Sequence, residues 1–160
     1  MNNISHADVS PTELAYAAGI IDGEGCICCK MKADLRFGVT VTNTSSVLME
    51  WLAAKFGGYT GVSNRSLRHD NNHKTSYHWE LGCRASRNFL RLIFPYLLLK
   101  RRQAELVLES GELLVGNKFK RHGISTENRM QRQKIADEIS ALNRRGKVAK
   151  KAGASRKHES

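Results

Sequence analysis

Residues 17–25 read AAGIIDGEG, a run of small and apolar residues that ends in two acids set among glycines. The segment from Thr12 to Asp22 is predicted to be helical, because Ser10 can cap it and the proline after Ser10 suits a first helical turn. The glycines that follow Asp22 are expected to end this helix. One side of it, at three- and four-residue spacing, carries only short side chains: Ala15, Ala18, Gly19 and Asp22. A face this small predicts close packing against a second helix.

Downstream, the apolar spacing alternates between that of strands and that of helices. The expected elements are two strands in 26–43, a helix from Ser45 or Ser46 to Phe56, strands at 59–65 and 75–83, helices at 85–94 and 99–115, and a last helix at 126–143. The apolar residues of the last helix, at helical spacing, are Met130, Ile135, Ile139 and Leu142. This order predicts an α+β fold, in which helices cover one face of an antiparallel sheet. We expect one domain over 1–143, followed by a basic tail without fixed structure over 144–160.

The outward face of the predicted sheet is polar and partly basic. Cys28, Lys30 and Lys32 alternate with apolar residues in the first strand, and Arg36 and Thr40 do so in the second. A curved basic sheet can lie in a DNA groove, where its side chains read the edges of bases. An ordinary solvent-facing sheet fits the same pattern equally well.

Charge favours a polyanionic partner. The chain has 26 Lys and Arg against 15 Asp and Glu, a net charge of +11. Residues 1–116 contribute only +2 of this charge, and residues 117–160 contribute +9. A solvated basic tail could therefore account for most of the charge without any specific partner.

The segment AAGIIDGEG resembles the signature of the LAGLIDADG homing endonucleases. Ala18, Gly19, Ile21, Asp22 and Gly25 match that signature outright. The segments FPYLLLKRRQAELVLE and ADEISALNRR resemble the branch of this family that carries one motif, and the similarity spans about 14–143. The resemblance implies an αββαββα core, whose curved sheet forms a DNA-binding saddle, with further helices at the C-terminus. Members with one motif pair their motif helices, so a homodimer is implied, with Ala15, Ala18, Gly19 and Asp22 at the interface.

The resemblance also implies a chemistry. The last acid of the motif, here Glu24, would bind a catalytic divalent metal, and the Gly23 carbonyl would contribute. Mg²⁺ is the implied ion, Mn²⁺ would substitute, and Ca²⁺ would support binding without cleavage. Lys100 would stabilise developing negative charge or tune a water, and Asn43 would orient the hydrolytic water. Asp22 would cap the partner helix or steady the turn.

The implied partner is double-stranded DNA. The candidate DNA contacts are Cys28, Lys30, Lys32, Arg36, Thr40, Arg65, Arg68, Ser76 and His78. The chain departs from the family at Val47, where the branch often has a basic residue. Arg101 or Arg102 could substitute for that group.

A zinc site is the competing interpretation of the cysteines. Cys26 and Cys29 form a C-x-x-C, and His69 and His73 an H-x-x-x-H, but the two pairs lie much farther apart than in zinc fingers. The crowded cysteines are better explained as small residues of a strand. They do not form a disulfide framework, so we expect a reducing compartment.

Two other functions remain open. A cleavage-inactive RNA maturase or DNA-binding regulator would share the fold, and a basic RNA-associated protein would bind without sequence preference. The first residues lack a secretory signal, and no apolar run approaches a membrane span, so no membrane partner is expected. We expect the protein to work inside the cell, in a chloroplast or mitochondrion or in prokaryotic or phage-infected cytoplasm.

Overall fold

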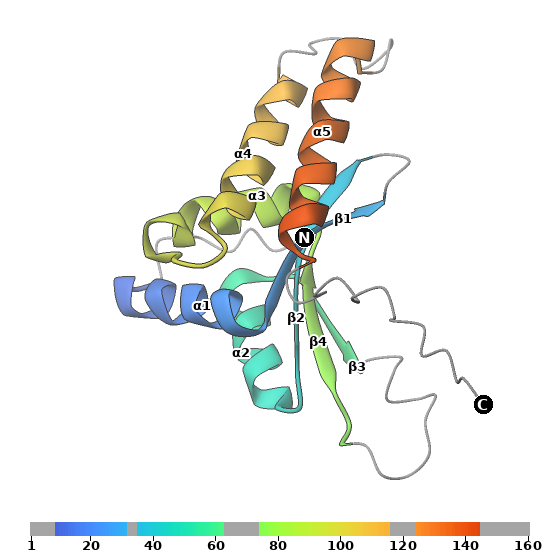
Figure 1. The fold of residues 1–160 in the computed structure, drawn as a ribbon. Coiled ribbons are helices and arrows are strands. Elements are labelled where there is room, and N and C mark those ends of the chain that lie inside the picture. The colour runs from blue at the N-terminus through green and yellow to red at the C-terminus, as the bar shows by residue number, and fades with distance from the viewer. Residues whose placement is uncertain (1–8, 32–34, 63–73, 116–123, 145–160) are drawn as a thin grey trace, which may run out of the picture.

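A computed structural model of the chain describes residues 9–31, 35–62, 74–115 and 124–144 (Figure 1). Its elements are α1 (Pro11–Glu24), β1 (Gly25–Met31), β2 (Arg36–Asn43), α2 (Ser46–Phe56), β3 (Tyr59–Val62), β4 (Tyr77–Leu81), α3 (Cys83–Ile93), the 3-10 helix η2 (Phe94–Tyr96), α4 (Arg101–Val115) and α5 (Thr126–Leu142). None of the helices in the described ranges has the length and apolar character that crossing a membrane requires.

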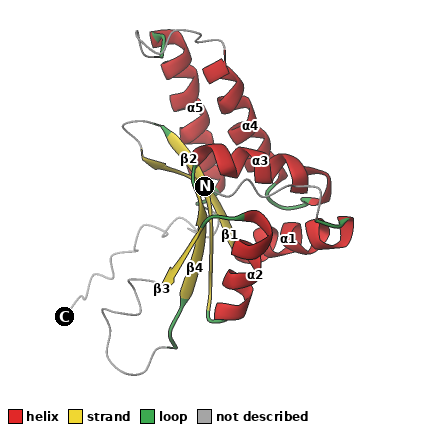
Figure 2. Ribbon diagram, turned by 180° about the vertical axis from the view of Figure 1, so that it is seen from behind, coloured by secondary structure: helices red, strands yellow, loops and turns green. Residues whose placement is uncertain are grey.

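The four strands form one antiparallel sheet in the order β1-β2-β4-β3. α1 and α3 pack on β2, α2 packs on β4, and α5 packs on β1 and α4. Figure 2 shows α1 and α2 on the same side of the strands. The predicted α+β fold and its order of helix, two strands, helix, two strands and helices are thus confirmed.

The core lies between the sheet and these helices. Trp79 of β4 is fully buried, its Nε1 donates to the Gly57 carbonyl oxygen at 2.7 Å, and its ring meets the Phe89 ring edge-on at 5.4 Å. The buried Ser86 hydroxyl accepts from the Val39 N–H at 3.1 Å and donates to the Leu81 carbonyl oxygen at 3.0 Å. These bonds attach α3 to two neighbouring strands, because backbone polar groups buried there need partners.

α1 runs farther than its sequence predicts. It continues through Gly23 and ends at Glu24, and the Gly25 N–H closes the last turn on the carbonyls of Ile20 and Ile21. A Cβ on Gly25 would lie 2.7 Å from the Cα of Ile21, so this tight exit from the helix requires glycine. The glycine that matters for ending the helix is therefore Gly25.

The boundaries around α3 and α4 also differ from the predicted ones. β4 ends at Leu81, and Gly82 is the N-cap of α3, so α3 begins at Cys83. α4 begins at Arg101, because the residues just before it are held in a bend by bonds to α1.

The apolar face predicted for α5 is partly wrong. Ile135 and Ile139 are buried as expected, but Met130 is 60% exposed. Arg132 is buried instead, because its Nη2 donates to the Leu35 carbonyl oxygen at 2.7 Å and its guanidinium lies over the Phe37 ring at 5.6 Å. Arg132 thus joins the core, whereas Met130, which the spacing placed there, does not.

Candidate active site at the end of the first helix

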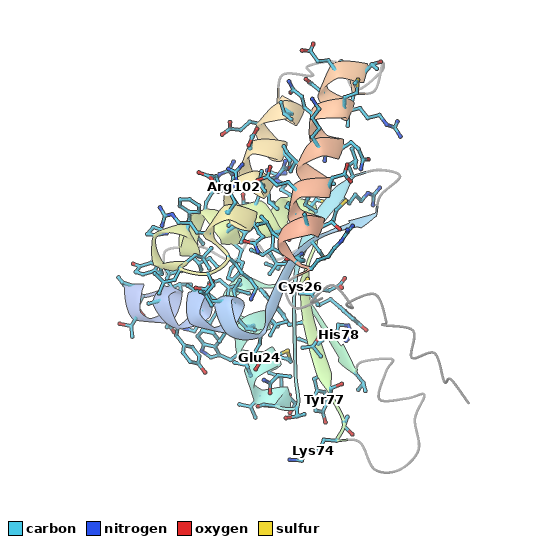
Figure 3. All side chains as sticks on the ribbon, viewed as in Figure 1. Glu24, Cys26, Lys74, Tyr77, His78 and Arg102 are labelled. Carbon is cyan, nitrogen blue, oxygen red and sulfur yellow. The ribbon has the colours of Figure 1, made fainter. Side chains whose placement is uncertain are left out.

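Glu24 stands at the junction of a helix and an edge strand. It is the last residue of α1 and is exposed, and β1 starts at the next residue (Figure 3). The N-terminal end of α1 is fixed by a capping box. The Glu13 N–H donates to the Ser10 hydroxyl oxygen, and the Ser10 N–H donates to the Glu13 carboxylate. Glu24 is therefore presented by a helix that is well anchored at its start.

Lys100 reaches the last turn of this helix. Its Nζ donates to the carbonyl oxygens of Ile21 at 2.8 Å and Asp22 at 2.6 Å. The Asp22 carboxylate bonds in return to the segment that contains Lys100. Its Oδ1 accepts from the Lys100 N–H and its Oδ2 from the Leu98 N–H, both at 2.8 Å. Lys100, which the family resemblance singled out, therefore contacts α1 at Asp22, two residues before Glu24.

Asn43 lies at the same end of the sheet as Glu24. Gly25 pairs with Val41 in the β1–β2 ladder, and Asn43 follows two residues later on β2. The Asn43 Oδ1 accepts from the Ser45 N–H at 3.0 Å, which fixes the turn into α2. Glu24 and Asn43 thus lie at one end of the sheet, and Lys100 is bonded to the helix turn that leads into Glu24.

The exposed side of α1 differs from the predicted interface. Ala18, which is also predicted at the interface, is fully buried within the chain, because helical geometry places it with Ile21 against the core. Ala15, Gly19 and Gly23 are exposed, and a Cβ added at either glycine would meet nothing within 4 Å. These three residues form the small outer face of α1.

Asp22, also predicted at the interface, bonds to its own chain. Both of its carboxylate oxygens accept hydrogen bonds from backbone N–H groups of its own chain. These bonds hold Leu98 and Lys100 in the bend before α4, whereas the resemblance implied that Asp22 caps the partner helix or steadies the turn at the end of its own helix.

An open apolar groove lies beside the small outer face. It has a volume of about 490 Å³ and is lined by Thr12, Glu13, Tyr16, Ser45, Val47, Leu48 and Trp51. Val47 is 71% exposed there. At the edge of the groove the Lys55 ammonium, 2.7 Å from the Glu13 carboxylate, and the Ser10 cap lower the pKa of Glu13 to about 2.

The outward sheet face is ordered in cross-strand rows. Cys28 pairs with Gly38, and Cys26 pairs with Thr40, which pairs in turn with Glu80. One step along, Thr42 pairs with His78. Arg36 is exposed at the start of β2, and Ser76 directly precedes β4. Of the predicted DNA contacts, these rows and their flanks include Cys28, Arg36, Thr40, Ser76 and His78.

The other predicted DNA contacts cannot be placed in this way. Lys30 belongs to β1, but only its backbone is described. Lys32, Arg65 and Arg68 lie outside the described residues, as do most of the basic tail and the pair His69 and His73.

The structure adds two candidates to the outward face. Tyr59 is 63% exposed, and its ring centroid lies 5.7 Å from that of His78. Glu80 pairs with Thr40 and Tyr59 in one row. The alternation of the predicted strand at 75–83 points Glu80 outward. The place of Tyr59 depends on the register of β3 on β4, which the sequence does not reveal although it predicts the two strands as a pair.

Within the part of the chain that the structure describes, no group of three or more His, Cys, Asp and Glu side chains comes together. The described residues therefore offer Glu24 and neighbouring backbone oxygens, rather than a complete set of side-chain ligands, at this end of α1.

Comparison with known proteins identifies the fold. No protein-family model matches the sequence, and no curated protein matches it. Among solved structures, the homing endonuclease I-CvuI in complex with its target in 2 mM Ca is 22% identical, covers 92% of this chain and 87% of its own, and gives a TM-score of 0.62. I-CvuI in complex with the I-CreI target in 2 mM Mg, where the DNA is not cleaved, is also 22% identical. The match covers 91% of this chain and 86% of I-CvuI, with a TM-score of 0.61.

A third solved structure extends the comparison to another source. The archaeal intron-encoded homing endonuclease I-Vdi141I, complexed with DNA, is 16% identical, covers 84% of this chain and 86% of its own, and gives a TM-score of 0.63. The chain therefore has the fold of the homing endonucleases, as its resemblance to the LAGLIDADG signature implied.

Proposed function

We propose that this chain is a site-specific endonuclease that cuts double-stranded DNA as a homodimer. The observation that carries the proposal is the position of Glu24, which is exposed at the end of α1 with Lys100 beside the same helix turn. The fold is that of proteins solved on DNA targets, and the outward sheet face supplies residues that can contact a duplex.

The residues at the end of α1 suit a hard divalent cation. A Glu24 carboxylate and the Gly23 carbonyl are oxygen ligands, which Mg²⁺ and Ca²⁺ prefer. We propose Mg²⁺, with Mn²⁺ as a substitute and Ca²⁺ supporting binding alone. Such an ion would neutralise phosphate charge and lower the pKa of a water.

A second chain would complete the site. The small outer face of Ala15, Gly19 and Gly23 runs along α1 toward Glu24, so pairing two such faces would bring the two Glu24 carboxylates together. A two-fold dimer would read a long, nearly palindromic DNA site across two sheets. Two strand breaks would then be made, which we propose to be staggered.

Lys100 and Asn43 act on groups near Glu24 in this proposal. An ammonium group has three N–H donors, and the two α1 carbonyls use two of them. The third would stabilise negative charge on the phosphate or hold a water. The side-chain amide of Asn43 would orient the attacking water, while its Oδ1 keeps the turn into α2. We further propose that the enzyme promotes mobility of a host intron or intein, inside an organelle or a prokaryotic or phage-infected cell.

Cleavage selection from a randomised duplex library tests the proposal. The wild-type chain with Mg²⁺ should yield fragments from one nearly palindromic site, and Ca²⁺ should give a gel shift without fragments. Glu24→Gln should cut at least ~100-fold more slowly, because a neutral amide is a poor ligand for a hard cation. The matched control is Glu112→Gln on α4, which is exposed and should cut normally.

The alternatives give different results. Equal cutting by Glu24→Gln and Glu112→Gln would rule out the active site. A sequence-specific gel shift without cutting under any metal would support a cleavage-inactive DNA-binding protein. Binding to any nucleic acid, with strong loss at high salt, would support the non-specific alternative.

A further inference from the structure

The last turn of α1 is capped from a distant part of the chain. The helix has no basic residue in that turn, although its carbonyls carry the negative end of the helix dipole. The Lys100 ammonium meets this need by donating to the carbonyl oxygens of Ile21 and Asp22. The Ile21 carbonyl also accepts from the Gly25 N–H, so Lys100 and the exit into β1 share one acceptor.

Lys100 is held in turn by the helix that it caps. It lies in the bend before α4, and its own N–H donates to Asp22 Oδ1, while the Leu98 N–H donates to Asp22 Oδ2. The side chain of Asp22 therefore fixes the backbone of Lys100, and the side chain of Lys100 fixes the backbone of Asp22. Each residue holds the other, in a closed set of bonds of 2.6 to 2.8 Å.

We propose that Asp22 and Lys100 form a reciprocal clamp that positions Glu24, and that Asp22 is a positioning residue for DNA cleavage. This inference rests on the proposed function. Glu24 is two residues beyond Asp22 in the same turn, so the clamp fixes the backbone from which its carboxylate projects. Asp22 acts through Lys100 and the helix end, and contacts neither DNA nor metal in this assignment.

The clamp makes a specific prediction about Asp22→Asn. An asparagine keeps the shape of the side chain but presents an NH₂ group to one of the two backbone N–H donors, so that one bond is lost and two donors oppose each other. Lys100 and the helix end should then shift. A misplacement of about 1 Å can cost roughly 100-fold in rate, so we expect cleavage roughly 10- to 100-fold slower.

Single-turnover cleavage over a range of Mg²⁺ concentrations separates positioning from general damage. Asp22→Asn should need more Mg²⁺ for its half-maximal rate, and it should still bind the target in Ca²⁺ with wild-type affinity. The matched control is Asp137→Asn, which removes an exposed acid of α5 that accepts a hydrogen bond from Gln133 in the same helix. A variant that cuts like Asp137→Asn, at the same Mg²⁺ midpoint, would overturn the proposal.

A double variant tests whether the two residues act as one unit. Lys100→Met breaks the other half of the clamp, so Asp22→Asn combined with Lys100→Met should cut no more slowly than the slower single variant. Rate losses that multiply in the double variant would show two independent roles and refute the clamp.

Amide hydrogen exchange tests the clamp without any measurement of activity. The Leu98 and Lys100 amides should be protected although Leu98 is 85% exposed, and Asp22→Asn should speed their exchange at least ~10-fold. Exchange at the rate of ordinary exposed amides in the wild type would overturn the clamp. Protected amides in a protein that cuts no DNA would instead overturn the proposed function alone.

Discussion

Arg132 of α5 donates from Nη2 to the carbonyl oxygen of Leu35, 97 residues away in the sequence, at 2.7 Å. Leu35 is buried and has a φ of 50°, a left-handed conformation that residues other than glycine rarely adopt. The buried guanidinium therefore ties the last helix to a strained residue at the entrance of β2.

Arg132→Ala should destabilise the protein by about 2–3 kcal/mol, because a buried hydrogen bond from a charged donor is lost and the Leu35 carbonyl is left without it. The measurement is the free energy of unfolding in urea. Arg144→Ala, which removes an exposed arginine after α5, should change that free energy by less than about 0.5 kcal/mol. Equal losses in the two variants would show that the Arg132–Leu35 bond contributes little.

The bond between Lys55 and Glu13 makes stability depend on pH. Lys55 and the Ser10 cap lower the pKa of Glu13 from 4.5 to about 2, so this contribution is full above about pH 4.5 and is lost as the pH falls toward 2. Glu13→Gln should remove that part of the pH dependence. Unfolding measured from pH 5 to pH 2 should therefore show the wild type and the variant converging, and a constant difference would contradict this account.

Gly58 occupies a position that other residues cannot take without strain. Its φ is 99°, and a Cβ there would lie 2.6 Å from the Glu80 carbonyl oxygen. Gly58→Ala should cost about 2–3 kcal/mol of unfolding free energy, from backbone strain and displacement of β4. Gly82→Ala is the control, because a Cβ at Gly82 meets nothing within 4 Å and should cost well under half as much.

Gly19 allows the small outer face of α1 to be tested without damage to the core. Gly19→Trp faces open space in the protomer, so the chain should stay folded while two helices can no longer approach. Sedimentation should give about twice 17.9 kDa for the wild type and 17.9 kDa for the variant, which should also lose cleavage. Ala141→Trp, on an exposed position of α5, should remain dimeric. A wild type that is monomeric at high concentration would refute the dimer.

The order of elements could be predicted from the sequence, because it depends on local spacing and caps. The Ser10–Glu13 capping box and the alternation of β2 and β4 are patterns of this kind. Which side of α1 is exposed could not be predicted. Alanines suit both a tight contact with a sheet and a helix pair, and only the three-dimensional structure shows that Ala18 serves the core while Ala15 is exposed.

The candidate site was predictable only in part. The motif placed Glu24, and the family resemblance placed Lys100 near it. The bonds between Asp22 and Lys100 join residues 78 apart, and no spacing rule links such positions. The burial of Arg132 rather than Met130 shows the same limit, because a buried arginine depends on an acceptor, here the carbonyl of Leu35, that lies far away in the sequence.

The dependence of α1 on Lys100 has a consequence for the newly made chain. Glu24 is synthesised early, but the ammonium that caps its helix arrives 78 residues after Asp22. Until that lysine has left the ribosome, the Gly25 N–H can close the last turn of α1, but the ammonium donor to the Ile21 and Asp22 carbonyls is missing. The growing polypeptide therefore completes this end of α1 only after Lys100 has been added.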